Sequence, residues 1–132
     1  MRIGIVGASS YPACELIRLL SGHPGGLSLE VITSRTADGT RISDVSPNLR
    51  GYCDLELEPT GLETLRGRVD TVVLSVPHRV AQEHAPSLLD AGFQVVDFSA
   101  DFRLHDADTY EAWYGVEHIA REFLPRAVYG LP

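Results

Sequence analysis

Residues 2–22 read RIGIVGASSYPACELIRLLSG, and they contain the signals of a strand, a turn and a helix in succession. The apolar run at 3–6 is short and rich in β-branched residues, which is typical of a strand buried on both faces. Gly7 allows a tight turn, and Pro12 suits the first turn of a helix because a backbone N–H there has no intrahelical partner. Strand, small-residue turn and helix, in this order, build the phosphate site of dinucleotide-binding folds.

The glycine pattern of this turn does not decide whether the turn binds a nucleotide. A spacing of G-x-x-G-x-x-G would place glycines at 7, 10 and 13, but the chain has Gly7, Ser10 and Ala13. Ala13 is small enough for a helix to pack closely on a strand, whereas Ser10 is a harder change if the backbone there must take a positive φ. On this stretch alone, a nucleotide site and an ordinary crossover between two strands are equally good interpretations.

Length and composition narrow the function classes. The 132 residues suit one domain, 1–132, and 44% hydrophobic with 22% charged residues favours a packed core over disorder. A net charge of −7 argues against a nucleic-acid partner. No apolar run reaches membrane-spanning length, so no membrane association is expected. Cys14 and Cys53 make neither a disulfide framework nor a metal set, so we expect no metal and a cytoplasmic location.

Strand and helix signals alternate along the rest of the chain. Further strands are predicted at 27–33, 54–58, 69–76 and 93–98, and helices at 60–66, 80–89 and 108–114. The pattern at 54–58 is that of a half-buried edge strand, and the helix at 60–66 is expected to begin with a capping box of Thr60 and Glu63. The alternation predicts an α/β fold, a Rossmann-like doubly wound parallel sheet.

The end of the second predicted strand bears on the choice of cofactor. A carboxylate there would hydrogen-bond the ribose of NAD, whereas an arginine accommodates the 2′-phosphate of NADP. Ser34 and Arg35 stand at this place, and no carboxylate follows until Asp38, so the pattern favours NADP. The alternative is a solvated arginine at a strand end.

Polar residues also follow the two later strands. His78 comes after Pro77, and Ser99 opens a loop that contains Asp101 and Arg103. Residues just past the carboxyl ends of parallel strands line the ligand crevice of such sheets. The alternatives are a surface histidine and a turn in which Asp101 pairs with Arg103.

The order and spacing of several blocks resemble the N-terminal domain of N-acetyl-γ-glutamyl-phosphate reductases, or of their relatives in lysine biosynthesis. The blocks are GASSY at 7–11, ELIRLL at 15–20, TSR at 33–35, PNLRG at 47–51, PH at 77–78, SADFRL at 99–104 and YGLP at 129–132. Together they span essentially the whole chain, and they are more specific than a glycine fingerprint.

The resemblance implies a role in arginine biosynthesis, where the family uses NADPH to reduce an acyl phosphate to a semialdehyde. An active-site cysteine forms a thioester with the acyl group, and a histidine assists. Carried over residue by residue, the cofactor-binding set is Gly7, Ser9, Ser10 and Tyr11 for the pyrophosphate, Ser34 and Arg35 for the adenosine phosphate, and Pro77, His78 and Ser99 for the crevice near the cofactor.

The family's catalytic cysteine lies in an Asn-Pro-Gly-Cys-type segment beyond the block at 129–132. The chain is therefore expected to be truncated before the catalytic and substrate domain, and no catalytic residue is assigned to it. Neither Cys14 nor Cys53 matches that role. We expect the isolated chain to be inactive, its small-molecule substrate to bind only in the full enzyme, and the chain to form a homo-oligomer. A stand-alone NADP-binding module and a degenerate interaction module remain alternatives, and the choice between the arginine and lysine pathways stays open.

Overall fold

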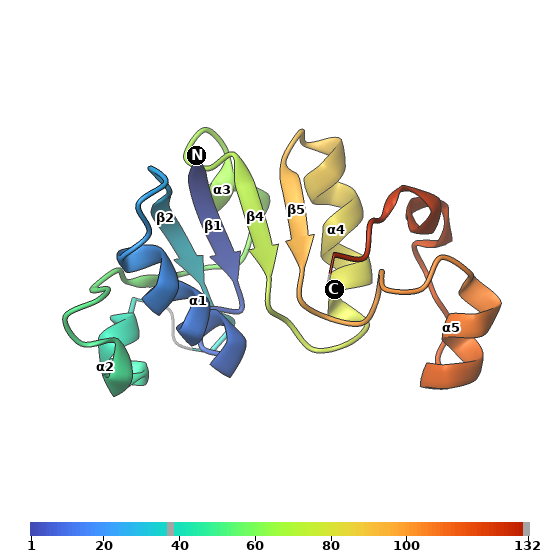
Figure 1. Ribbon diagram of the computed structural model, residues 1–132, viewed down its shortest axis with the longest axis horizontal. Coiled ribbons are helices and arrows are strands. Elements are labelled where there is room, and N and C mark those ends of the chain that lie inside the picture. The colour runs from blue at the N-terminus through green and yellow to red at the C-terminus, as the bar shows by residue number, and fades with distance from the viewer. Residues whose placement is uncertain (37–38, 131–132) are drawn as a thin grey trace.

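Parallel strands form one twisted sheet at the centre of the molecule (Figure 1). The computed structural model describes residues 1–36 and 39–130, and in this part five strands pair in the order β3-β2-β1-β4-β5. They are β1 (Arg2–Val6), β2 (Ser28–Thr33), β3 (Leu57–Glu58), β4 (Thr71–Leu74) and β5 (Gln94–Asp97). The predicted doubly wound parallel sheet is confirmed. The strand order reverses between β1 and β4, and sheets of this kind bind ligands outside the carboxyl ends of the strands at such a point.

Helices cover both faces of this sheet. One face carries α1 (Tyr11–Ser21), α2 (Ile42–Val45) and the 3₁₀ helix η1 (Pro47–Leu49), and the other carries α3 (Leu62–Leu65) and α4 (Val80–Asp90). After β5, the chain forms α5 (Ala107–Tyr114) and the 3₁₀ helix η2 (Arg121–Arg126), which Figure 1 shows beyond α4. The α5 segment thus extends the molecule past β5 without adding a layer to the sheet.

The core follows the alternation of side chains along the strands. Ile3 and Ile5 of β1 pack with Ile17 of α1, whereas Val72 and Leu74 of β4 pack on the opposite face with α3 and α4. Complete burial of such side chains contributes about 1.5–3 kcal/mol each. These two apolar layers fix the sheet rigidly beneath the loops at its carboxyl edge.

Two local predictions are wrong for identifiable reasons. The edge strand expected at 54–58 shrinks to Leu57–Glu58, because the residues before it pair with the segment 40–42 instead of β2: Arg41 and Glu56 form an antiparallel bridge. The expected capping box is absent, since Gly61 is the N-cap of α3 and the Thr60 hydroxyl donates instead to Thr33 Oγ1 at 3.0 Å.

Candidate functional site

The turn between β1 and α1 is wedged between the ends of β2 and β4. The backbone N–H groups of Gly7 and Ala8 both donate to the carbonyl oxygen of Thr33, at 3.1 and 3.0 Å. Gly7 has a φ of +86°, and a Cβ added there would collide with the backbone carbonyl oxygen of Ser75. Only glycine satisfies both conditions, so Gly7 fixes the close approach of the turn to β4.

Ser10 begins α1 and anchors its first turn. Its φ of −77° is ordinary, so the positive φ that would have made serine unfavourable here is not required. The Ser10 hydroxyl accepts a hydrogen bond from the N–H of Ala13 at 3.4 Å and lies 2.7 Å from the Ser75 hydroxyl. Ala13 is completely buried against the sheet. The two departures from a glycine pattern are therefore compatible with the turn.

Two backbone donors of this turn remain uncommitted. Among the described residues, the N–H groups of Ser9 and Tyr11 donate to no protein acceptor, whereas those of Gly7, Ala8 and Ser10 do. Both lie at the amino end of α1, where the helix dipole favours negative charge. N–H groups of this kind at the amino end of a helix can bind an anion.

At the end of β2, Ser34 and Arg35 differ in accessibility. Ser34 is buried, and its N–H donates to the carbonyl oxygen of Glu58 at 3.2 Å. Arg35 is exposed, and it forms no ion pair within the part of the chain that the structure describes. Asp38, the first carboxylate after this strand, lies outside the described residues. Arg35 can therefore reach a ligand, while the Ser34 hydroxyl is largely shielded.

The remaining predicted residues lie past β4 and β5. Pro77 and His78 are exposed in the loop before α4, and His78 Nδ1 accepts a hydrogen bond from the N–H of Ala100 at 3.4 Å. The N–H and hydroxyl of Ser99 both donate to the Asp97 carboxylate, at 2.9 and 2.7 Å. Burial raises the pKa of Asp97, although these bonds from Ser99 oppose the shift. Ser99 thus stabilises its own loop.

The nine predicted cofactor residues all lie at or after the carboxyl ends of β1, β2, β4 and β5, along one edge of the sheet. Sequence reasoning did not assign a role to Ser75, which meets the turn from β4, or to Gln82, which is buried in α4. The sequence signal that could have identified Gln82 is that it is a polar residue on the buried face of the helix predicted at 80–89. The alternative pairing of Asp101 with Arg103 is wrong: Asp101 bonds to α4, and Arg103 lies over the Tyr129 ring at 5.5 Å.

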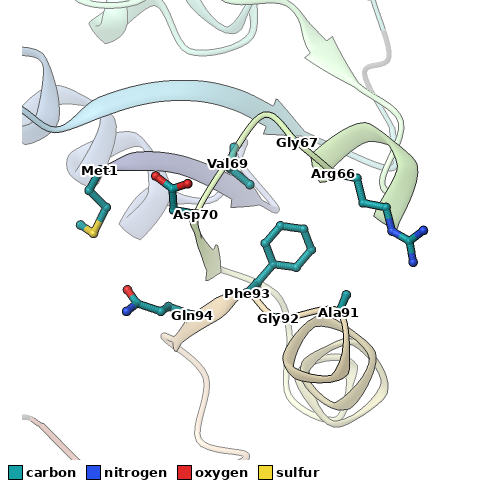
Figure 2. A pocket seen from close by; sticks show the side chains of 9 residues that line it. All are labelled: Met1, Arg66, Gly67, Val69, Asp70, Ala91, Gly92, Phe93 and Gln94. Carbon is teal, nitrogen blue, oxygen red and sulfur yellow. The ribbon is translucent and has the colours of Figure 1, made fainter.

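A separate hollow of about 570 Å³ lies at the opposite, amino-terminal edge of the sheet (Figure 2). It is lined by Met1, Arg66, Gly67, Val69, Asp70, Ala91, Gly92, Phe93 and Gln94. Its carboxylate, Asp70, is already paired with Arg2 at 2.7 Å. This hollow shares no residue with the predicted cofactor set.

Neither cysteine is placed as an activated thiol. Cys14 is buried, with its Sγ 3.2 Å from the Ser46 hydroxyl. Burial raises the pKa of Cys53, which disfavours the nucleophilic thiolate. Within residues 1–36 and 39–130, no three His, Cys, Asp or Glu side chains gather as metal ligands would. In that same part of the chain, every helix is too short or too polar to cross a membrane.

NAD(P)-binding domains are doubly wound parallel sheets with free backbone N–H donors in the turn after the first strand. This chain has such a sheet and such a turn after β1, and an exposed arginine follows β2. The family model described as "Semialdehyde dehydrogenase, NAD binding domain" matches residues 2–132, and the chain belongs to this family. Within it, the chain corresponds to the N-terminal domain of N-acetyl-γ-glutamyl-phosphate reductases and the related [LysW]-aminoadipate reductases. The resemblance predicted from the sequence is confirmed.

Curated relatives match the whole chain but extend well beyond it. The N-acetyl-γ-glutamyl-phosphate reductase of Pseudomonas aeruginosa is 48% identical over 133 residues, and the match covers 100% of this chain and 38% of the relative. The [LysW]-L-2-aminoadipate/[LysW]-L-glutamate phosphate reductase of Sulfurisphaera tokodaii is 42% identical with the same coverage, 100% and 38%. The chain therefore spans about two fifths of the length of these relatives.

Solved structures share the fold. An aspartate semialdehyde dehydrogenase from Candida albicans, solved with NADP, superimposes with a TM-score of 0.67 at 22% identity, over 77% of this chain and 30% of that one. A 3-ketoreductase from Actinomadura kijaniata, in complex with TDP-benzene and NADP, gives a TM-score of 0.57 at 22% identity, over 92% and 35% of the two chains. At such identities the likeness shows the fold alone.

Proposed function

We propose that the chain is the NADP-binding domain, spanning residues 1–132, of an N-acetyl-γ-glutamyl-phosphate reductase, an enzyme that reduces an acyl phosphate to a semialdehyde with NADPH. The observation that carries the proposal is the combination of uncommitted N–H donors at Ser9 and Tyr11 with an exposed Arg35 at the end of the neighbouring strand. The first group suits a pyrophosphate and the second a 2′-phosphate.

The residues along the carboxyl edge of the sheet would bind different parts of the cofactor. The turn of Gly7, Ser9, Ser10 and Tyr11 would receive the pyrophosphate, and Arg35 would make charge-assisted hydrogen bonds to the 2′-phosphate. Ser34 would contribute less than its position in the sequence suggested, because its side chain is buried. When bound, the cofactor supplies the hydride. Pro77, His78 and Ser99 would border its nicotinamide half.

We propose the arginine-pathway substrate rather than the lysine-pathway one, and sequence similarity supports this choice. The Pseudomonas aeruginosa reductase is 48% identical to the chain, whereas the [LysW] reductase of Sulfurisphaera tokodaii is 42% identical. Because the substrate would bind mainly to parts of the enzyme outside this chain, this choice does not alter the roles proposed for the cofactor residues.

Calorimetric titration of the chain with NADPH tests this proposal. We expect saturable binding, with an affinity that falls as salt is added because the contact between Arg35 and the 2′-phosphate is between opposite charges. Absence of binding would contradict the proposal and would favour a degenerate interaction module that has kept the fold without the cofactor.

We expect the isolated chain to bind the cofactor without catalysing the reduction. A thioester mechanism needs a thiolate, and Cys14 is buried while the pKa of Cys53 is raised by burial. Oxidation of NADPH in the presence of N-acetyl-γ-glutamyl phosphate, followed by absorbance, is the measurement. Turnover that disappears in Cys14→Ser but persists in Cys53→Ser would show that Cys14 is the nucleophile and that this expectation is wrong.

We further propose that the chain self-associates through the uncovered face of β5. Val96 lies on the same face as the buried Val73 of β4, yet Val96 is 45% exposed and Phe98 is 42% exposed. Adjacent exposed apolar side chains on an edge strand promote association. Sedimentation should show dimers or larger species, and Val96→Lys should shift them toward monomer. Leu19→Lys, on the exposed side of α1, is the matched control; monomers of the unmodified chain at high concentration would refute the proposal.

A further inference from the structure

Four buried polar side chains form one hydrogen-bonded network between α4 and the segment after β5. They are Gln82, Asp101, Tyr110 and His118, each at most 2% exposed. The Tyr110 hydroxyl donates to Asp101 Oδ1 at 2.8 Å, and the Gln82 amide donates to the Tyr110 oxygen at 3.0 Å. His118 Nε2 donates to the backbone carbonyl of Asp101 at 2.7 Å. A fully satisfied buried network of this kind specifies one arrangement of the elements it joins.

Asp101 caps α4 from another part of the chain. The N-cap of α4 is Arg79, whose own side chain makes no capping hydrogen bond. Asp101 instead accepts from the N–H of Arg79 at 3.0 Å and from the N–H of Gln82 at 3.3 Å. Its carboxylate also complements the positive end of the helix dipole. Asp101 therefore provides the acceptor for two N–H groups at the amino end of α4.

The capped segment is strained. Arg79 has a φ of +75° and is the one non-glycine residue with a positive φ within residues 1–36 and 39–130. Such a conformation costs free energy and persists only where the surroundings enforce it. Pro77 and His78 directly precede Arg79, so the hydrogen bond from the Arg79 N–H to Asp101 constrains the backbone that carries them along the carboxyl edge of the sheet.

We propose that Asp101 is a positioning residue for the part of the crevice that receives the nicotinamide half of the cofactor. The inference rests on the proposed function, because a dinucleotide in this fold crosses from β2 past β1 toward β4. The adenosine half and pyrophosphate would be held by Arg35 and the turn at Ser9, and none of the hydrogen bonds that Asp101 makes within the described residues involves them. The nicotinamide half would meet the loop at His78, which Asp101 holds in place through Arg79.

Comparing NADPH with 2′,5′-ADP tests this role, because 2′,5′-ADP has the adenosine half and the 2′-phosphate but no nicotinamide. Asp101→Asn keeps the shape of the side chain but replaces one carboxylate oxygen with an NH₂ group. That group cannot accept a hydrogen bond from a backbone N–H. We expect NADPH affinity to fall about tenfold, and that of 2′,5′-ADP by less than about twofold. Asp106→Asn is the matched control, since Asp106 caps α5 by accepting from the N–H of Thr109 at 2.8 Å. It should change neither affinity.

Hydrogen exchange supplies a readout that needs no cofactor. In Asp101→Asn, the amides of Arg79 and Gln82 should exchange about tenfold faster or more, while that of Thr109 is unchanged. Asp106→Asn should leave the exchange of all three amides nearly unchanged, because a single oxygen of Asp106 accepts both bonds from Thr109 and the asparagine amide keeps such an oxygen. Tyr110→Phe, which keeps the carboxylate, should change exchange and NADPH affinity in the same direction by a smaller factor, and it serves if Asp101→Asn does not fold.

The outcomes separate the inference from the function on which it rests. If Asp101→Asn lowers the affinities for NADPH and for 2′,5′-ADP by the same factor, Asp101 acts only on the fold. If NADPH affinity is unchanged although the amide of Arg79 exchanges faster, the loop is not part of the cofactor site. Either result overturns the positioning role. Failure of the unmodified chain to bind either ligand would instead overturn the proposed function, and unchanged exchange at Arg79 and Gln82 would independently reject the capping role of Asp101.

Discussion

Replacing Gly7 by alanine should destabilise the chain by about 3 kcal/mol or more and abolish cofactor binding. The positive φ of +86° costs a non-glycine residue about 1–3 kcal/mol. The added Cβ would also collide with the Ser75 carbonyl oxygen, and relief of such overpacking costs typically about 1–3 kcal/mol more. Because the collision is with backbone, no side chain can move aside to remove it.

The same change should displace the turn that carries the uncommitted N–H groups of Ser9 and Tyr11. Thermal unfolding followed by circular dichroism should show a midpoint lower by roughly 10 °C, and NADPH titration should show no saturable binding. Gly22→Ala is the matched control: Gly22 caps the carboxyl end of α1 at a φ of −111°, with open space around it. That change should alter stability by less than about 0.5 kcal/mol. A Gly7→Ala protein as stable as the Gly22→Ala protein would contradict the geometry of the turn.

NADPH should bind about tenfold more tightly than NADH, and Arg35→Ala should remove most of this difference. A charge-assisted hydrogen bond contributes roughly 1.5–3 kcal/mol, which is a factor of about 10 to 150 in affinity. Arg35 is exposed, so solvent screening places the expected effect at the lower end of this range. NADH lacks the 2′-phosphate, and its affinity should therefore be nearly unchanged by the substitution.

Calorimetry on two proteins with two cofactors forms a double cycle for this contact. Arg66→Ala is a charge-matched control, because Arg66 lines the hollow at the amino-terminal edge of the sheet (Figure 2). Arg66→Ala should lower the affinity for NADPH and the affinity for NADH only slightly, and by the same factor. Equal losses for NADPH and NADH in Arg35→Ala would mean that Arg35 supports the fold or the pyrophosphate, and the argument for NADP specificity would fail.

The sequence predicted the sheet well because its signals are local. The apolar run of β1, Gly7 and the amphipathic α1 lie within residues 2–22, and their order alone indicates a strand, a turn and a helix. The parallel sheet follows from the alternation of strands and helices along the rest of the chain. Arg35 could likewise be placed at a strand end, since its position depends only on where β2 stops.

The sequence left two positions open because their partners are distant in sequence. Asp101 has Arg103 two residues away, yet its carboxylate bonds to the N–H of Arg79, 22 residues earlier, and to Tyr110. No local pattern distinguishes a charged turn from a cap supplied to another helix. The glycine pattern could not show that the φ of Ser10 is ordinary. Nor could it show that the Ser10 hydroxyl lies within hydrogen-bond distance of the hydroxyl of Ser75, 65 residues later. Tertiary contacts decided both positions.

If the proposed function is right, NADP(H) binds along the carboxyl edge of the sheet, with its pyrophosphate on the turn after β1. Amide chemical shifts, followed by NMR as NADPH is added to the chain, test this most directly. The largest shifts should occur at Ser9 and Tyr11, because backbone N–H groups that gain an anionic acceptor change most. A smaller shift should occur at Arg35, whose side chain would contact the 2′-phosphate. If the largest shifts appear instead at Gly67 and Gly92, which line the hollow at the opposite edge of the sheet, then the cofactor does not bind on the turn after β1.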